Sequence, residues 1–283
     1  MNTSTRRFEE RTADMGTMSA TGLDADSVSV TYVRKRSGEE VVALEELSLK
    51  IAPRSFVSIV GPSGCGKSTF LKVVGGLEVP TKGRISLNGR DIEDAADSRA
   101  MVFQDASLFP WYSVARNITY GLECRGMSAK EARERILPLI ETVGLSGFER
   151  HFPYELSGGM QQRVNLARAL AVDPEILLMD EPFAALDAQT REVMQGELLR
   201  VWSTTRKTVL FVTHQIDEAI FLSDRVITMS ARPGRVLLDI DVDLPRPRPL
   251  AIKEDPKFLA IHKQIWSVLE EEVLRSMRLQ DRA

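Results

Sequence analysis

The segment Gly61–Ser68 reads Gly-Pro-Ser-Gly-Cys-Gly-Lys-Ser and has the residue types that bind phosphate. Its glycines let backbone N–H groups converge on phosphate oxygens, and a helix beginning at its end adds a favourable dipole. Lys67 can reach the β- and γ-phosphates of a nucleotide, and the Ser68 hydroxyl can ligate Mg²⁺. An apolar run at 55–60 precedes the loop, and 69–74 can form a helix, which is the context this motif requires. The predicted nucleotide-binding residues are Gly61, Pro62, Ser63, Gly64, Cys65, Gly66, Lys67, Ser68 and Thr69.

Two adjacent carboxylates, Asp180 and Glu181, follow the apolar run 175–179. In open α/β sheets, ligands bind at the carboxyl ends of the strands, which is where these acids are expected to lie. Asp180 is suited to holding Mg²⁺, directly or through water. Glu181 can polarise a water for in-line attack on a γ-phosphate. Such a pair can also be two solvated acids at a strand end, but a phosphate loop on the same chain favours the chemical role.

Two polar residues follow other predicted strands. Gln104 comes directly after the run 101–103, and His214 comes directly after the run 208–213. If these strands share a sheet edge with the phosphate loop, Gln104 can contact Mg²⁺ or the attacking water. His214 can then contact the γ-phosphate and orient the water. The alternatives are that Gln104 is ordinary polar surface and that His214 is structural.

A second motif, Leu-Ser-Gly-Gly-Met-Gln-Gln-Arg at 156–163, combines a good helix N-cap, Ser157, with two glycines that permit close approach of a ligand. We therefore predict a second anion-binding site formed by Ser157, Gly158, Gly159 and Gln161. One nucleotide does not need two such sites on one chain. The motif therefore indicates two chains that share two nucleotides.

Composition narrows the class of protein. The chain has 283 residues, 43% of them hydrophobic, which is enough to bury a sizeable core. A formal net charge of −3 disfavours a nucleic-acid binder that relies on a generally basic surface. The two cysteines, Cys65 and Cys124, fit a reducing compartment and indicate neither a disulfide framework nor a metal site. No apolar run is long enough for a transmembrane helix, so we expect any membrane role to act through a partner.

Strand-like and helix-like patterns alternate along the chain. Strands are expected at 27–33, 41–51, 55–60, 84–87, 101–103, 175–179, 208–213, 225–229 and 238–244. Helices are expected at 69–75, 128–143, 157–171, 189–204, 215–222 and 258–277, with Pro138 kinking or splitting the second. Strands that alternate with helices predict an α/β fold with a largely parallel sheet covered on both faces.

We divide the chain into three parts. Residues 1–25 are polar and are expected to form a flexible extension. Residues 26–245 form the main domain, with a helical insertion at about 106–172. Residues 246–283 comprise a Pro-Arg-rich linker, expected to be extended, and a C-terminal amphipathic helix that docks as a tail.

In this order, the phosphate loop, Gln104, the segment 156–163, the run 177–181, the segment 185–187 and His214 resemble the motifs of ATP-binding-cassette ATPases. The resemblance covers roughly residues 27–230. It implies a P-loop NTPase fold with a mostly parallel core, an antiparallel β edge and a helical insertion subdomain.

The resemblance also implies roles. Lys67, Gln104, Glu181 and His214 would be catalytic, with Glu181 the general base. Ser68, Gln104 and Asp180 would hold Mg²⁺, and ATP would be the nucleotide. ATP would lie between the phosphate loop of one chain and Ser157–Gly159 of another, in a head-to-tail dimer whose contact includes Asp187. Tyr32 looks like the aromatic that stacks on adenine, unless it is an ordinary strand tyrosine.

Finer features look like the nitrate, sulfonate and taurine importer branch, including 102–104, 108–111, 180–183, 187–191 and 213–219. That likeness implies an ATPase subunit of an importer, peripheral on the cytoplasmic face of the plasma membrane. Its partners would be permease subunits and, indirectly, a solute-binding protein, with no nucleic acid. Phe109–Trp111 is the candidate permease contact, unless these aromatics simply pack the helical insertion.

Departures from that branch fall at Arg54-Ser55, Ala184 and Asn165, none of them a predicted catalytic position. Two other hypotheses stay open on the residues. A soluble cassette ATPase in DNA repair or translation would usually carry a long coiled-coil insertion or a second cassette, and neither is visible here. A P-loop kinase would transfer the γ-phosphate to a small acceptor, and the segment 156–163 disfavours it.

Overall fold

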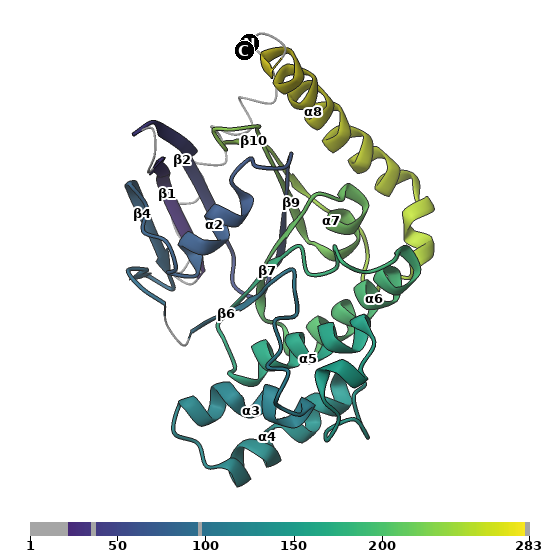
Figure 1. Ribbon diagram of the computed structural model, residues 1–283. Helices are drawn as coiled ribbons and strands as arrows, with labels where there is room; N and C mark the ends of the chain where they lie inside the picture. The colour runs from purple at the N-terminus through teal and green to yellow at the C-terminus, as the bar shows by residue number, and fades with distance from the viewer. Residues whose placement is uncertain (1–21, 35–37, 96–97, 281–283) are drawn as a thin grey trace.

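The structure, a computed structural model, describes residues 22–34, 38–95 and 98–280, with side chains described as far as Leu274. It contains two sheets (Figure 1). An antiparallel sheet has the order β2-β1-β4-β5, with β1 Leu23–Val33, β2 Glu40–Ile51, β4 Lys82–Leu87 and β5 Arg90–Asp91. A larger sheet has the order β10-β9-β3-β8-β7-β6, with β3 Phe56–Val60, β6 Arg99–Val102, β7 Ile176–Asp180, β8 Thr208–Thr213, β9 Arg225–Met229 and β10 Val236–Asp241.

The larger sheet is parallel except at its β10 edge, which pairs antiparallel with β9. Its central strands are apolar throughout because both faces are covered. On β3, Val57 and Ile59 pack toward the antiparallel sheet and α2 (Lys67–Val74), while Phe56 and Val60 pack toward the helices on the other face. The expected α/β architecture, with a parallel core and an antiparallel edge, is confirmed.

A helical block lies at one end of the molecule, below the sheets in Figure 1. It contains α3 (Val114–Cys124), α4 (Ala129–Thr142), the short 3-10 turn η1 (Pro153–Glu155) and α5 (Gly158–Ala171). We expected Pro138 to kink or split α4, and α4 is not split but runs as one helix through it. Pro138 and the residue four positions earlier, Glu134, are both exposed, so water can satisfy the carbonyl that the proline leaves without a donor.

The remaining helices cover the larger sheet and its edge. They are α6 (Ala188–Thr205), α7 (Ile216–Leu222), the 3-10 turn η2 (Leu250–Glu254) and α8 (Pro256–Gln280). Phe258, Ile265 and Leu269 form the buried face of α8 and belong to the same hydrophobic core as α7. Figure 1 shows α8 along the outer edge of the molecule, past α7 and β9.

The Pro-Arg-rich segment before α8 is bound to the domain rather than acting as a free linker. The guanidinium of Arg248 is buried and donates to the carbonyls of Ile220, Phe221 and Ser223 at the end of α7. Burial lowers the pKa of Arg248 to about 10. Arg246 pairs with Asp224 at 2.8 Å. The cationic side chains therefore bind the orphan carbonyls of a helix C-terminus, where cations are favoured.

The N-terminal boundary also differs from expectation. β1 begins at Leu23, inside the segment expected to be a flexible extension. Leu23 and Ala25 are buried and pair with β2 and β4. Residues 1–21 of that expected extension lie outside the described residues. The other domain boundaries stay predictions.

Candidate functional site

The register of the parallel strands brings the predicted site residues to one sheet edge. Val60 of β3 pairs with Thr213 of β8, and Val212 of β8 pairs with Asp180 of β7. On the other side of β7, Met179 pairs with Val102 of β6. The four strands therefore end level with one another. Their carboxyl ends lead into the phosphate loop, His214, Glu181 and Gln104, as the sequence predicted.

The phosphate loop wraps around the ammonium group of Lys67. The Lys67 Nζ donates to the carbonyl oxygens of Gly61 at 2.8 Å and Pro62 at 3.0 Å, and its side chain is buried. Gly66 has a φ of +104° and caps α2, so the loop turns directly into the helix. A Cβ on Gly66 would lie 2.8 Å from the carbonyl oxygen of Ala43, so β2 packs against the loop too closely for a side chain.

Ser68 and Asp180 form a pair of oxygen donors at this edge. The Ser68 Oγ donates to Asp180 Oδ1 at 2.9 Å, although the residues are 112 positions apart. Burial raises the pKa of the Asp180 carboxyl, the Ser68 hydrogen bond opposes that shift, and neighbouring Glu181 adds to it. A hydroxyl and a half-buried carboxylate are hard oxygen ligands that suit Mg²⁺, which usually takes one or two protein ligands beside substrate phosphates. The site therefore fits the metal without a larger cluster of His, Cys, Asp and Glu, and none is found among the described residues.

Glu181 and His214 form a second polar pair next to the first. The Nδ1 of His214 lies 2.8 Å from Glu181 Oε2. Glu181 adopts a left-handed backbone, with φ of +45°, and its N–H donates to Val212 at 2.9 Å. A glutamate in this conformation is strained, and such strain persists where the surrounding structure imposes it, commonly at functional sites.

A buried network behind His214 was missed by our sequence analysis. Glu218, on α7, is 4% exposed and accepts hydrogen bonds from Thr213 and, at 3.0 Å, from Gln195. The Thr213 hydroxyl also accepts from the N–H of Gln215 at 3.0 Å. Hydrogen bonds therefore hold Thr213 and Gln215, the residues on either side of His214. Burial raises the pKa of Glu218. An acid among the apolar positions of a short helix was the one signal that could have revealed it.

Gln104 lies two residues beyond β6 and is exposed. The segment after it is tied to the helical block. Arg168, on α5, donates to the carbonyls of Ser107 at 2.9 Å and Ala106 at 3.0 Å. Buried Asn117, on α3, accepts from the N–H of Phe109 at 2.8 Å and donates to the same residue's carbonyl at 3.1 Å. The segment that follows Gln104 is therefore anchored to α3 and α5.

The second predicted anion site lies at the start of α5. Ser157 is the N-cap, and its side chain accepts from the N–H of Met160 at 3.3 Å. Ser157 and Gly158 are exposed, so the helix N-terminus is open to solvent. The Gln161 amide donates to the carbonyls of Pro153 at 2.9 Å and Leu156 at 3.4 Å, so protein groups next to the N-cap already hold it. The direct ligand contact of Gln161 stays a prediction.

Two further predicted residues lie at the margins of the site. Asp187 is the exposed N-cap of α6 and accepts from the N–H of Thr190 at 2.9 Å, and this bond lowers the pKa of its carboxyl. Tyr32 lies near the end of β1, opposite Val41 of β2, and is 37% exposed. β2 is also the strand that packs on Gly66, so the sheet carrying Tyr32 borders the phosphate loop.

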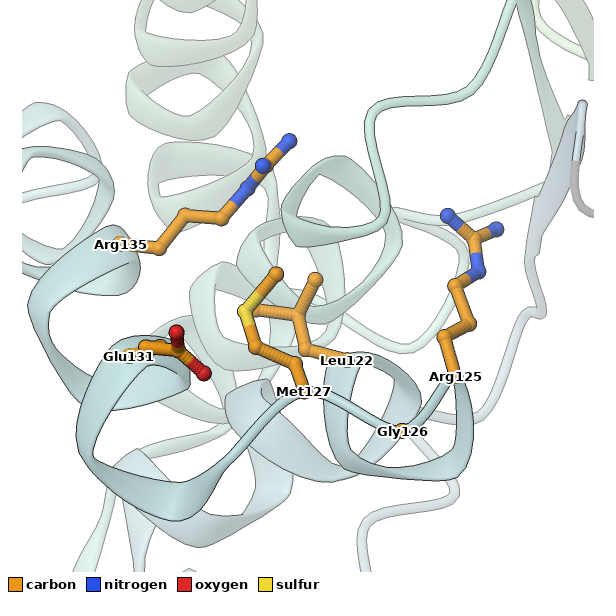
Figure 2. Close-up of a pocket in the computed structure, with 6 residues that line it drawn as sticks. All are labelled: Leu122, Arg125, Gly126, Met127, Glu131 and Arg135. Carbon is orange, nitrogen blue, oxygen red and sulfur yellow. The ribbon is translucent and has the colours of Figure 1, made fainter.

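A shallow pocket on the helical block contains none of the predicted site residues. Figure 2 shows it at the turn between α3 and α4, where Arg125, Glu131 and Arg135 surround the side chains of Leu122 and Met127. Elsewhere, no helix in the described part of the chain is both long and apolar enough to cross a membrane.

Known proteins resemble this chain over most of its length. The ABC transporter family profile matches residues 44–184. An uncharacterized ABC transporter ATP-binding protein of Methanocaldococcus jannaschii is 47% identical, over 88% of this chain and 92% of its own. Taurine import ATP-binding protein TauB of Rhizobium johnstonii is 46% identical, over 90% of this chain and 99% of its own.

Among solved structures, a dimeric ATP-binding cassette in a post-hydrolysis state, bound to ADP and Pi, superposes with a TM-score of 0.68. It is 35% identical, and the match covers 79% of this chain and all of that one. Relatives this similar over most of the chain show the family. The chain therefore belongs to the ATP-binding-cassette ATPases of ABC transporters.

Proposed function

We propose that the chain is the ATP-hydrolysing subunit of an importer that takes up a small solute, such as taurine, an alkanesulfonate or nitrate, through a separate permease. The observation that carries this proposal is the meeting of the Ser68–Asp180 and Glu181–His214 pairs beside the phosphate loop. Relatives named as taurine import ATP-binding proteins support the importer branch. The permease and the solute-binding protein that acts through it are inferred by the same likeness.

The hydrolytic step follows from the side chains at the sheet edge. Lys67 binds the β- and γ-phosphates of ATP, while Ser68 and Asp180 would hold Mg²⁺, which would neutralise phosphate charge there. A Glu181 carboxylate oxygen accepts the proton of the attacking water, and the γ-phosphate leaves as inorganic phosphate with ADP as the second product. His214 keeps Glu181 in place through Nδ1, so its Nε2 is the ring atom left for the γ-phosphate. Gln104 contributes a further oxygen to the metal or the water.

A second copy of the chain completes the site. The open N-terminus of α5 at Ser157–Gly159 is suited to the γ-phosphate of an ATP held by the other copy, since helix N-termini bind anions. Asp187 contributes to the contact between the copies, and Tyr32 stacks on the adenine. Loss of the γ-phosphate removes the group that bridges the copies, so the dimer opens after hydrolysis.

The permease contact is assigned to Phe109–Trp111. Trp111 is 67% exposed, and Asn117 holds the loop that carries it through bonds to the carbonyls of Phe109 and Tyr112. Phe109 is half-buried against Tyr112 and Tyr120, so Trp111 is the exposed aromatic of this segment, and an exposed tryptophan on a well-held loop is an effective protein-binding anchor. We infer that the link between Trp111 and Gln104 through the same loop couples nucleotide state to the permease. Binding to the permease would hold the chain peripherally at the cytoplasmic face of the membrane.

The test is ATP-driven uptake by the chain reconstituted in liposomes with importer permease and solute-binding subunits from the same organism. Lys67→Ala abolishes ATPase activity and uptake, whereas Lys72→Ala, an exposed lysine on the same helix, retains both. Trp111→Ala keeps basal ATPase but loses uptake, and Tyr154→Ala, also exposed, loses neither. Uptake that survives Lys67→Ala, or that Trp111→Ala leaves unchanged, refutes the corresponding part of the proposal.

A further inference from the structure

The C-terminal helix α8 has a second apolar face that the domain does not cover. Its buried face, Phe258, Ile265 and Leu269, packs on the core. Leu259, Trp266 and Leu274 are exposed by 55%, 52% and 47%. Leu259 and Trp266 are seven residues apart and Leu274 follows eight later, so all three lie along one stripe of the helix. An uncovered stripe of this kind marks an interaction surface.

The charges within this stripe are arranged symmetrically. Lys263 lies midway between Leu259 and Trp266, and Glu270 lies midway between Trp266 and Leu274. Both charged side chains are exposed, and neither forms an ion pair within the described part of the chain. When the stripe is followed from the C-terminal end instead of the N-terminal end, the apolar residues keep nearly the same spacing, and Glu270 takes the place of Lys263. A surface that is complementary to its own reverse fits a second copy of itself about a twofold axis.

We propose that α8 is a self-association surface that pairs two copies of this chain in antiparallel orientation. A twofold axis between Trp266 and Ser267 places Leu259 opposite Leu274 of the second copy. The same register places Lys263 opposite Glu270 of the second copy, and the symmetry forms that ion pair twice. The Trp266 side chains meet near the axis, where a large aromatic contributes most to binding.

The position of α8 links this surface to the nucleotide site. Glu272 of α8 accepts a hydrogen bond from the N–H of Ala231 at 3.0 Å. The next residue, Arg232, donates to the carbonyl of Gly64 in the phosphate loop at 3.2 Å. Paired α8 helices therefore hold two phosphate loops within one assembly before nucleotide binds. A single helix pair is a small interface, so we expect a concentration-dependent dimer with a dissociation constant of roughly micromolar order.

A membrane surface is the other partner that an exposed apolar stripe of a helix can bind. The charges of α8 disfavour membrane binding. Glu270, Glu271 and Glu272 follow one another on the second half of the helix. Anionic membranes repel such a run, whereas membrane-surface helices carry lysine and arginine on their polar faces.

The experiment is sedimentation equilibrium of the full chain. Nucleotide is left out so that an ATP-dependent dimer does not contribute, and a reductant prevents disulfide-linked dimers. The wild type forms a dimer. Trp266→Glu raises the dissociation constant about 100-fold, and Lys263→Glu and Glu270→Lys each raise it about tenfold. Glu271→Lys, the same charge change off the stripe, has no effect. Thermal unfolding verifies that each variant is folded, as expected for exposed positions.

The decisive arm mixes the Lys263→Glu and Glu270→Lys chains. In the mixed dimer both opposed positions again carry opposite charges, so the mixture associates with the affinity of the wild type. A monomeric wild type overturns the proposal. So does a mixture as weak as its components, or binding of the wild type to lipid vesicles that Trp266→Glu abolishes. None of these outcomes depends on the proposed ATPase role, which Lys67→Ala tests separately.

Discussion

The two predicted anion sites of the chain differ in how complete they are. At the sheet edge, Lys67, Ser68 and Asp180 already contact other protein groups, and the loop packs against β2 at Gly66. At the start of α5, Ser157 and Gly158 face solvent. In our proposal the first site holds and hydrolyses ATP, whereas the second is a helix N-terminus that binds the γ-phosphate of an ATP held by another copy of the chain.

The difference also extends to backbone strain. Glu181 has a left-handed φ of +45°, while Ser157 has the extended φ of −66° that is ordinary for an N-cap. Strain accompanies the residue assigned to chemistry, and relaxed geometry accompanies the residue assigned to recognition. We therefore expect substitutions at the sheet edge to affect turnover and substitutions at the start of α5 to affect assembly.

The largest expected effect is on turnover at the sheet edge. Glu181→Gln keeps the shape of the side chain but removes the base, so kcat falls by roughly 10²–10⁴-fold. ATP affinity, measured by calorimetry, stays close to that of the wild type. Glu141→Gln, at an exposed position on α4, is the matched control and keeps full turnover. Turnover retained by Glu181→Gln removes this residue from the base role.

The next effect separates the two sites directly. Ser157→Ala removes the N-cap of α5 and costs about 1 kcal/mol of stability. Ser128→Ala removes the cap of α4, where the same kind of bond is present, and costs a similar amount. Both are measured by urea unfolding. Only Ser157→Ala is expected to weaken ATP-induced dimerisation, and equal behaviour of the two variants would mean that the α5 terminus has no special role.

A smaller effect is expected behind the site. Glu218→Gln keeps one acceptor oxygen but loses the carboxylate that holds Thr213, so His214 is positioned less well. We expect kcat to fall by about tenfold with little change in KM for ATP. Glu218→Ala should be worse, because it leaves the Gln195 amide without its acceptor. If both the Gln and the Ala variants keep the kcat of the wild type, the network does not position His214.

The smallest effect is on stability and depends on pH. Burial raises the pKa of Asp180 in the folded protein, so the folded state binds a proton more tightly than the unfolded chain does. This contribution is fully present below the usual aspartate pKa and is lost as pH rises through the raised one. Asp180→Asn should therefore stabilise the metal-free protein at pH 7, as measured by urea unfolding. The gain should vanish below about pH 4, and a gain independent of pH would contradict the assignment.

Most of the sheet edge could be predicted because its signals are local. The strand before Gly61, the glycines of the loop and the acids after β7 each lie in a short stretch with its own pattern. The Glu181–His214 contact spans 33 residues and the Ser68–Asp180 contact spans 112, so both depend on strand order and register. From the sequence, these residues could be expected at one sheet edge, but which of them contact each other could not be predicted.

Two features could not be predicted because the residues involved usually indicate a different structure. Arg248 lies in a Pro-Arg run that normally indicates a solvated linker, yet its guanidinium is buried on carbonyls at the end of α7. Pro138 normally ends a helix, yet α4 continues through it. In both cases the deciding factor is the neighbouring backbone, which carries unpaired carbonyls in one case and faces water in the other.

The central claim is that ATP is shared by two chains through the two unlike sites. It is tested most directly by light scattering on Glu181→Gln saturated with ATP and Mg²⁺, in the Trp266→Glu background that removes α8 pairing. We predict a species of twice the chain mass that reverts to one chain mass when Ser157→Ala is added. A Glu181→Gln protein that binds ATP and stays at the mass of one chain would contradict the account.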